Sequence, residues 1–201
     1  MVACSLLCFV SRMVRPPPDV RIGPLKQLLG EEQIRTEVCR MAREIAVYYA
    51  TRPLTVIGVL CGSMILVADL IRCLDLPMRV GVVQARSYRG PTTTGGALTV
   101  NDSMLPDIRG RDVLLVDDIF DTGRTLAALT AQMRSLGASS VRTAVLLNKQ
   151  GRQEVDLRPD YKCFDIPDVF VVGYGLDYED AYRHLPYVAV LEPHDLATGP
   201  D

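Results

Sequence analysis

Apolar and polar residues follow a helical period near the start of the chain. Between residues 31 and 50, apolar side chains recur every three or four positions, with polar residues opposite: Ile34, Val38, Ala42, Ile45 and Tyr49. This spacing predicts an amphipathic helix that buries one face. The segment MILVADLIRCL at 64–74 is apolar on nearly every side and predicts a second, more buried helix.

Short apolar runs between glycine-rich or polar segments predict the strands. They are LTVIGVL (54–60), MRVGVVQARSY (78–88), DVLLVDD (112–118), SVRTAVLLNK (140–149), VFVVGYG (169–175) and YVAVLEP (187–193). The run at 112–118 is typical of a strand buried on both faces of a parallel sheet. A helix from about Thr125 to Leu136, stopped by Gly137, follows it. The alternation of strands and helices predicts an α/β fold with a mainly parallel sheet flanked by helices.

Length and composition place this pattern in one ordinary globular domain. The chain has 201 residues, 48% hydrophobic and 23% charged, with a net charge of -2. We expect a disordered extension at 1–18, a single domain at 19–195 and a tail at 196–201. The balance of charge predicts no nucleic-acid partner. The apolar run near the start is too short to span a bilayer, and its arginines follow it, so we predict a cytoplasmic protein with no membrane segment.

The cysteines give no sign of a metal site and leave the predicted fold unchanged. No C-x-x-C pair is present and only two histidines could join them, which argues against a structural zinc site. Several lie in apolar runs, so we expect most of them to be reduced, small core residues. The six are Cys4, Cys8, Cys39, Cys61, Cys73 and Cys163.

The candidate chemistry lies in VLLVDDIFDTGRTL, residues 113–126. Asp117 and Asp118 end a buried strand, and Asp121 follows in a loop that leads into a helix. Ligands of parallel sheets bind at the carboxyl ends of the strands. Free amides of the loop 121–125 would form an anion site there, with hydroxyls from Thr122 and Thr125 and a close backbone approach at Gly123. A phosphate cradle beside paired carboxylates suits a ribose 5-phosphate.

Acidic residues at the end of an apolar strand are also found in other kinds of site. A magnesium-holding strand of an ATPase requires G-x-x-x-x-G-K-[ST], which the chain lacks. A dinucleotide site requires G-x-G-x-x-G, and GYGLDY has Tyr178 in the third glycine's place. A solvated acidic turn that only caps a helix remains the structural alternative.

The stretch resembles the phosphoribosyl-pyrophosphate (PRPP) motif of type I phosphoribosyltransferases. IPDVFVVGYGLDYEDAYRHLPYVAVL (166–191) is similar to the C-terminal stretch of the hypoxanthine-guanine phosphoribosyltransferases, and VLCGS, RSY and LLNK fall in that family's order. The resemblance covers roughly residues 20–193. It implies a small hood formed by the terminal segments. It also implies purine salvage, in which ribose 5-phosphate passes from PRPP to hypoxanthine or guanine, giving IMP or GMP and pyrophosphate.

The resemblance also assigns roles to the acidic stretch. Asp117 and Asp118 would hold the ribose hydroxyls, and the loop Asp121, Thr122, Gly123, Arg124 and Thr125 would hold the 5-phosphate. Asp121 would lie near N7 of the purine as general acid or base, unless it only caps the helix.

The remaining roles come from the same resemblance. Lys149 would meet O6 of the purine, Phe170 would stack on the base, and the Val171 backbone would face its edge. Asp177 would lie at the purine and, with Asp117 and Asp118, near the Mg²⁺ ion that accompanies pyrophosphate. The pyrophosphate would be bound by Leu60, Cys61, Gly62 and Arg183. Ser87 and Tyr88 would belong to a mobile lid.

Two departures from the family pattern bear on these roles. Relatives usually carry a lysine after Leu60, often across a cis peptide, where this chain has Cys61; amides of Gly62 and Ser63 could still bind pyrophosphate. Arg124 stands where lysine is common.

The resemblance implies a homodimer or homotetramer. A regulator of the same fold that binds RNA is the alternative, but it would be expected to show a basic face, and Lys149, Phe170 and Asp177 favour the enzyme.

Overall fold

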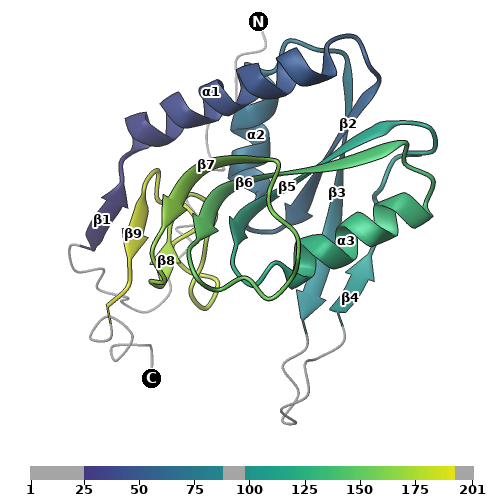
Figure 1. The fold of residues 1–201 in the computed structure, drawn as a ribbon. Helices are drawn as coiled ribbons and strands as arrows, with labels where there is room; N and C mark the ends of the chain where they lie inside the picture. The colour runs from purple at the N-terminus through teal and green to yellow at the C-terminus, as the bar shows by residue number, and fades with distance from the viewer. Residues whose placement is uncertain (1–24, 88–97, 193–201) are drawn as a thin grey trace, which may run out of the picture.

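A six-stranded sheet with the order β4-β3-β2-β5-β6-β7 forms the centre of the computed structural model, which describes residues 25–87 and 98–192 (Figure 1). All neighbours are parallel except β4, which pairs antiparallel with β3 at one edge. The mainly parallel sheet is as predicted. The strands are β2 (Leu54–Leu60), β3 (Met78–Ser87), β4 (Leu98–Asn101), β5 (Asp112–Phe120), β6 (Ser140–Lys149) and β7 (Tyr161–Ile166).

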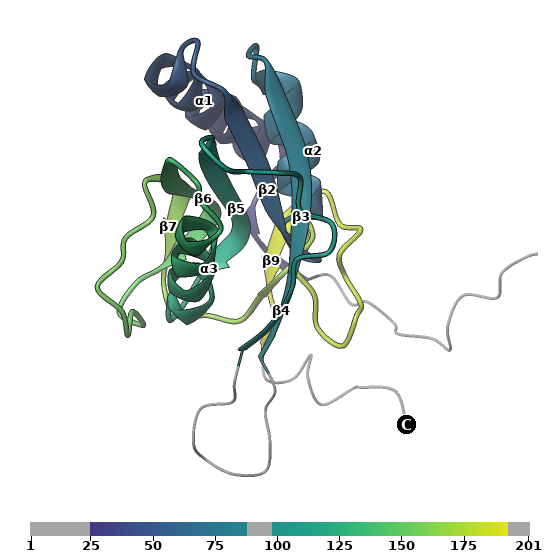
Figure 2. The same cartoon turned by 90° about the vertical axis from the view of Figure 1, so that its right-hand side faces the viewer.

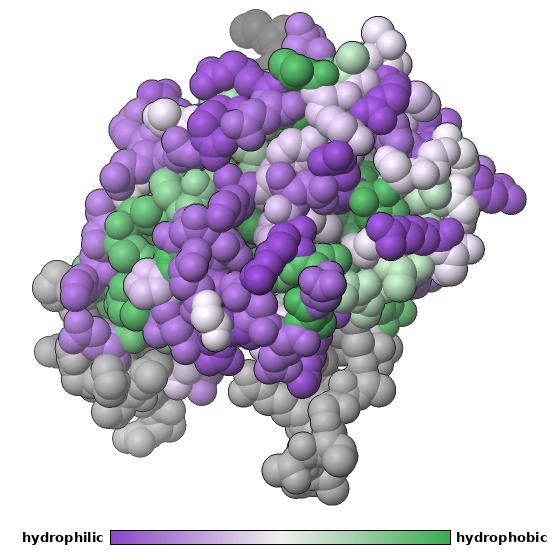
Figure 3. All heavy atoms as spheres, in the orientation of Figure 1, coloured by the Kyte–Doolittle hydropathy of each residue, from purple (hydrophilic) through white to green (hydrophobic). Residues whose placement is uncertain are grey.

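Helices cover both faces of this sheet (Figures 1 and 2). α1 (Glu31–Tyr49) and α2 (Met64–Cys73) lie on one face, and α3 (Arg124–Ser135) lies on the other. Successive strand residues point to opposite faces, so in β5 Leu114 packs with α1 and α2 while Leu115 packs with α3. Both faces are therefore buried, which explains the continuous apolar runs of the central strands. Polar side chains cover most of the outer face in view, with smaller hydrophobic patches between them (Figure 3).

A small antiparallel sheet joins the two ends of the described chain. Its order is β1-β9-β8, with β1 (Lys26–Leu29), β8 (Val171–Val172) and β9 (Val188–Val190). It lies near the edge of the main sheet at which β5 and β6 end (Figure 1). This is the hood implied by the sequence resemblance.

The predicted strand at 169–175 is wrong over most of its length. Only Val171 and Val172 are in a strand. Gly173 and Gly175 have φ angles of 94° and 99°, which end the extended backbone and turn the chain toward the main sheet. The strand predicted at 112–118 runs on to Phe120, and the helix after it begins at Arg124. The strands β1, β4 and β7 were not predicted.

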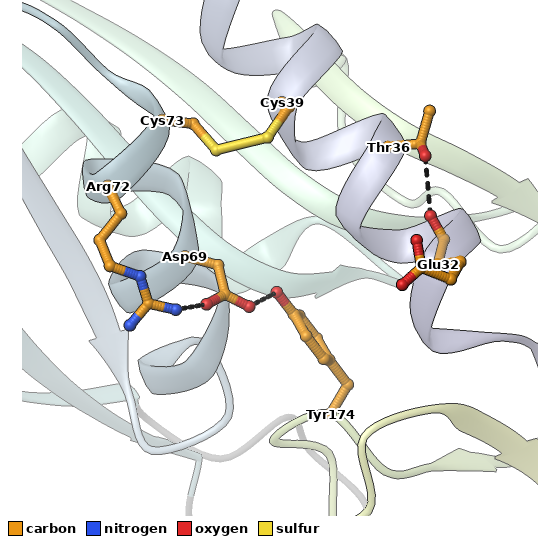
Figure 4. The surroundings of a disulfide bond; sticks show 7 residues. All are labelled: Glu32, Thr36, Cys39, Asp69, Arg72, Cys73 and Tyr174. Atoms are coloured by element: carbon orange, nitrogen blue, oxygen red, sulfur yellow. Dashed lines mark hydrogen bonds and ion pairs between the residues drawn. A yellow bond between two sulfur atoms is a disulfide. The ribbon is translucent and has the colours of Figure 1, made fainter.

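The prediction that most cysteines are reduced core residues also needs correction. α1 and α2 pack side by side, which brings the Cα atoms of Cys39 and Cys73 to 5.6 Å, and the two form a disulfide (Figure 4). That spacing is within the usual range for a disulfide. Cys163 is buried and free as expected, but free Cys61 is exposed. Cys4 and Cys8 lie outside the described residues.

No helix in the described ranges has the length and apolar character needed to span a membrane.

Candidate active site

The predicted site residues gather at the carboxyl edge of the main sheet. β2 and β6 flank β5 as parallel neighbours, so the segments that follow these strands leave the sheet at the same edge. The hood contributes the segment 173–183 to this region. Four parts of the chain that are distant in sequence therefore form one site: 60–63, 117–125, 149–154 and 168–183.

Asp117 and Asp118 lie in β5 and are held by the local backbone. The Asp118 amide donates to Asp117 Oδ1 at 3.0 Å, and the Ile119 amide donates to Asp118 Oδ1 at 2.8 Å. Burial raises the pKa of Asp117 well above its usual range, and the charge of Asp118 raises it further. Burial also raises the pKa of Asp118, although hydrogen bonds and Arg183 partly oppose that change. Such a pair calls for a ligand that brings hydroxyl donors or positive charge.

Gly62 fits directly against this pair. A Cβ atom at Gly62 would lie 1.6 Å from Asp118 Oδ2, and one at Gly175 would lie 2.1 Å from the Gly62 carbonyl oxygen. The loop 60–63 is thus held between the carboxylates and the segment 173–183, and the two glycines permit that approach. The Leu60–Cys61 peptide is cis. The Ser63 amide donates to the Val59 carbonyl at 3.4 Å, so of the two amides expected to bind pyrophosphate, Ser63's is already engaged.

The expected 5-phosphate loop begins α3. Gly123 is the N-cap residue, with φ 82°. A Cβ atom there would lie 2.6 Å from both Phe120 Cζ and Val155 Cγ2, so only glycine fits without rearrangement. The Thr122 carbonyl accepts the Glu154 amide at 3.0 Å. The Arg124 guanidinium forms an ion pair with Glu154. Thr125 is partly buried in the first turn of α3.

Asp121 does not cap the helix, because the N-cap residue is Gly123. Its Oδ1 atom is buried and accepts no hydrogen bond from the described residues. Arg152 Nε lies 2.8 Å from this oxygen, and this contact is an ion pair without hydrogen-bond alignment. A buried acceptor left in this state is suited to a donor from a bound ligand.

The expected purine-binding residues lie around the ends of β6 and β8. The Lys149 side chain is only 11% exposed, and its Nζ lies 3.5 Å from Asp168 Oδ1. The Phe170 side chain is exposed and packs edge-to-face with Tyr178, with ring centroids 5.7 Å apart. Val171 is buried in the hood. An exposed aromatic ring held by a second ring offers a surface on which a base can stack.

Asp177 and Arg183 form an ion pair in the segment 173–183. Arg183 Nη2 lies 2.8 Å from Asp177 Oδ1, and Arg183 Nη1 donates to the Gly175 carbonyl at 2.8 Å. Tyr174 fixes this segment to α2, since its hydroxyl donates to Asp69 Oδ2 at 2.5 Å (Figure 4). Burial and this hydrogen bond raise the pKa of Tyr174. Arg183 and Asp177, candidates for binding pyrophosphate and magnesium, therefore lie in one segment that is attached to α2.

The structure says little about two of the expectations, the lid and the metal site. Ser87 is the last residue of β3, while Tyr88 and the rest of the predicted lid lie outside the described residues. Within 25–87 and 98–192, no three metal-ligating side chains cluster closely enough to hold an ion by themselves. Asp117, Asp118 and Asp177 would therefore share any ion with oxygens of the substrate.

Sequence reasoning did not identify Arg152 and Asp168 as site residues. Arg152 lies 2.8 Å from Asp121, and Asp168 lies 3.5 Å from Lys149. Asp168 belongs to the IPDVF stretch that supported the resemblance, but nothing in the sequence shows which cation it meets.

The main sheet is largely parallel, its strand β5 carries paired carboxylates near its carboxyl end, and a glycine loop and a hood complete the site. This is the arrangement of a phosphoribosyltransferase. A family model described as the phosphoribosyl transferase domain matches residues 24–179.

Relatives place the chain more closely. The hypoxanthine-guanine phosphoribosyltransferase of Streptococcus pneumoniae is 37% identical over 167 residues, which cover 83% of this chain and 93% of that protein. The enzyme of the same name from Bacillus subtilis is 38% identical over 169 residues, covering 84% and 93%. A crystal structure of a Staphylococcus aureus hypoxanthine phosphoribosyltransferase matches with a TM-score of 0.82 at 34% identity, covering 89% of this chain and 98% of that one. The chain belongs to the type I phosphoribosyltransferases and, within them, to the hypoxanthine-guanine phosphoribosyltransferase family.

Proposed function

We propose that this protein is a purine-salvage enzyme that transfers ribose 5-phosphate from PRPP to hypoxanthine or guanine. The products are IMP or GMP and pyrophosphate. The observation that carries the proposal is the buried Asp121 Oδ1, which pairs with Arg152 but accepts no hydrogen bond from the described residues. It lies in the loop between the paired carboxylates and the start of α3. The names of the relatives agree with this activity.

The chain's own residues supply positioning and electrostatics. Asp117 and Asp118 orient the ribose by accepting hydrogen bonds from its hydroxyls. The amides of 121–125 bind the 5-phosphate at the positive end of α3. The reacting carbon gains positive charge as pyrophosphate leaves, and the paired carboxylates stabilise that charge. Asp121 accepts the proton from N7 of the purine, while Lys149 donates to O6.

The pyrophosphate side uses Arg183 and the loop 60–63. Arg183 is held by the Gly175 carbonyl and by Asp177, so its charge faces the same site as Asp118. Asp177, Asp117 and Asp118 are the residues that would hold Mg²⁺ together with substrate oxygens. When bound, Mg²⁺ neutralises charge that builds up on the leaving pyrophosphate.

Several properties remain expectations. The family resemblance implies a homodimer or homotetramer and a lid that includes Ser87 and Tyr88, while the sequence predicts a cytoplasmic location and no nucleic-acid partner. The alternative of an RNA-binding regulator is disfavoured because Lys149, Phe170 and Asp177 are all present, as an enzyme requires, and because the relatives are named as enzymes.

One assay tests the proposal. Purified protein is mixed with PRPP, Mg²⁺ and, separately, hypoxanthine, guanine, xanthine or adenine, and nucleotide formation is followed. We expect IMP and GMP to form and adenine to be inert, because its 6-amino group is a donor and Lys149 has no acceptor to offer it. Efficient use of adenine, or no use of either hypoxanthine or guanine, would contradict the assignment.

A further inference from the structure

Four charged side chains of alternating sign form a continuous chain beside the expected purine position. Arg152 Nε lies 2.8 Å from Asp121 Oδ1, and Arg152 Nη1 lies 3.3 Å from Asp168 Oδ2. The other Asp168 oxygen, Oδ1, lies 3.5 Å from Lys149 Nζ. Arg152 and Asp168 thus connect the expected acid-base residue to the expected O6-binding residue. We call this chain the charge bridge.

The charge bridge crosses three neighbouring strands. Asp121 follows β5, Lys149 ends β6, and Asp168 follows β7, which pairs with β6. Arg152 lies in the loop after β6, and that loop is fixed on both sides. The Gln150 amide donates to the Ile166 carbonyl at 2.9 Å, and the Glu154 amide donates to the Thr122 carbonyl at 3.0 Å. The backbone of Arg152 is therefore tied to β7 on one side and to the phosphate loop on the other.

The chemistry of Arg152 suits a spacer between two carboxylates. A guanidinium presents several N–H groups in a rigid plane, so one side chain can meet Asp121 through Nε and Asp168 through Nη1. A lysine ammonium is a single point charge on a flexible stem and cannot hold the same spacing. Because the Arg152 contact is not aligned as a hydrogen bond, Asp121 Oδ1 keeps its acceptor capacity for a ligand.

We propose that Arg152 and Asp168 are positioning residues that set the separation of Asp121 and Lys149 for the purine ring. N7 and O6 belong to one rigid ring system, so the two protein groups must meet two points at a fixed spacing. Misplacement by about 1 Å can cost on the order of 10²-fold in rate. This inference rests on the proposed function.

Exposure separates this role from a purely structural one. The Arg152 and Asp168 side chains are 44% and 50% exposed. Ion pairs exposed to that degree contribute little to the stability of the fold. Loss of Arg152 should therefore appear in the kinetic constants and hardly at all in thermal unfolding.

The test compares steady-state kinetics and melting temperatures of four variants with the wild type. Arg152→Gln should lower kcat by about 10- to 100-fold, with KM for PRPP within about threefold of wild type. Arg152→Lys should recover part of that loss. Asp168→Asn should raise KM for hypoxanthine by roughly five- to tenfold, because Lys149 loses the charged partner that orients it. In the double variant Arg152→Gln/Asp168→Asn, the effects should be less than multiplicative, as expected for residues that act as a unit.

Arg109→Gln is the matched control. Arg109 also pairs with a carboxylate, Asp107, through Nε at 2.9 Å, but precedes β5 and lies at the opposite edge of the sheet. Wild-type kinetics should persist in this variant. Wild-type kinetics in Arg152→Gln or in Asp168→Asn, or multiplicative effects in the double variant, would overturn the inference. An inactive wild type would instead contradict the proposed function. If Arg152→Gln does not fold, Arg152→Lys and Asp168→Asn decide by the same comparison.

Discussion

Charged residues lie at both ends of the main-sheet strands, which we call the amino edge and the carboxyl edge, but they are paired differently at the two. At the amino edge, the charges have close, aligned partners. Arg111 donates to Thr55 Oγ1 and to the Leu54 carbonyl, each at 2.7 Å. Asp160 accepts the Thr143 amide at 2.8 Å and Arg142 at 3.0 Å. These groups satisfy one another without a ligand.

At the carboxyl edge, several charged groups lack the aligned partners that charges have at the amino edge. Asp117 is buried, the adjacent Asp118 is partly buried, and both have raised pKa values. Asp121 Oδ1 is buried with no aligned donor, and Phe170 exposes its ring. Interactions that a protein does not satisfy internally are available to a ligand. The difference teaches where to look for function: among the charges that the fold holds apart or leaves without donors.

The largest effect is expected from a substitution that removes a single charge at the carboxyl edge. Asp121→Asn should lower kcat by about 10²- to 10⁴-fold, because an amide cannot accept the proton from N7. KM for PRPP should change little, since the loop amides remain. Steady-state kinetics with varied PRPP measure both constants.

The same chemical change at the amino edge provides the control. Asp160→Asn should lower the melting temperature through its contacts with Thr143 and Arg142 while leaving kcat near the wild-type value. Equal losses of PRPP binding and of rate in Asp121→Asn would favour a structural role for Asp121.

The second prediction changes the contact between the pyrophosphate loop and the carboxylates. Gly62→Ala places a methyl group 1.6 Å from the present position of Asp118 Oδ2, so the carboxylate or the loop must move. We expect KM for PRPP to rise by about tenfold or more. Gly110→Ala at the amino edge is the control: its Cβ meets nothing within 4 Å, although φ is 67°. That variant should lose about 1 kcal/mol of stability from backbone strain, with unchanged KM. Equal KM values in both variants would contradict the close fit at Gly62.

The third prediction concerns stability at the amino edge. Arg111→Met removes two hydrogen bonds and leaves the fully buried Thr55 hydroxyl without its partner. The free energy of unfolding should fall by about 1–3 kcal/mol, which corresponds to a melting temperature lower by several degrees. Thermal unfolding followed by circular dichroism measures the shift. The kinetic constants of the folded variant should match the wild type, and a large loss of kcat would show that the two edges are not independent.

Sequence patterns sufficed for the parts of this molecule that repeat a local rule. The β2 and β6 bounds agree with the apolar runs because both faces of these strands are buried. The helix after β5 also begins within one residue of its predicted start. The resemblance supplied the residue roles, and the structure brings Asp118, Gly62 and Arg183 into one region.

Contacts between residues that are far apart in the sequence could not be predicted from such local patterns. Whether Cys39 meets Cys73, or Arg152 meets Asp121, depends on how helices and loops pack, and no local pattern records it. The strand predicted at 169–175 failed for a related reason. Val171 and Val172 are buried as a strand pattern predicts, but the glycines after them turn the chain so that Gly175 can contact Gly62. The close approach of these two glycine-containing segments overrides the apolar pattern.

The smallest expected effect is at Cys61, where relatives usually carry lysine. Cys61 is exposed, and the neighbouring Gly62 packs against Asp118, so the position of the loop does not depend on the side chain at 61. Cys61→Ser should therefore keep kcat and KM for PRPP within about threefold, since an exposed substitution removes no charged contact.

Positive charge for pyrophosphate would come from Arg183. Arg183→Ala should therefore raise KM for PRPP steeply, because charge-assisted phosphate contacts are the strong ones. Cys61→Lys tests whether a second cation lowers KM further. A Cys61→Ser variant without activity, beside an Arg183→Ala variant with nearly normal PRPP kinetics, would show that the side chain of residue 61 binds pyrophosphate after all.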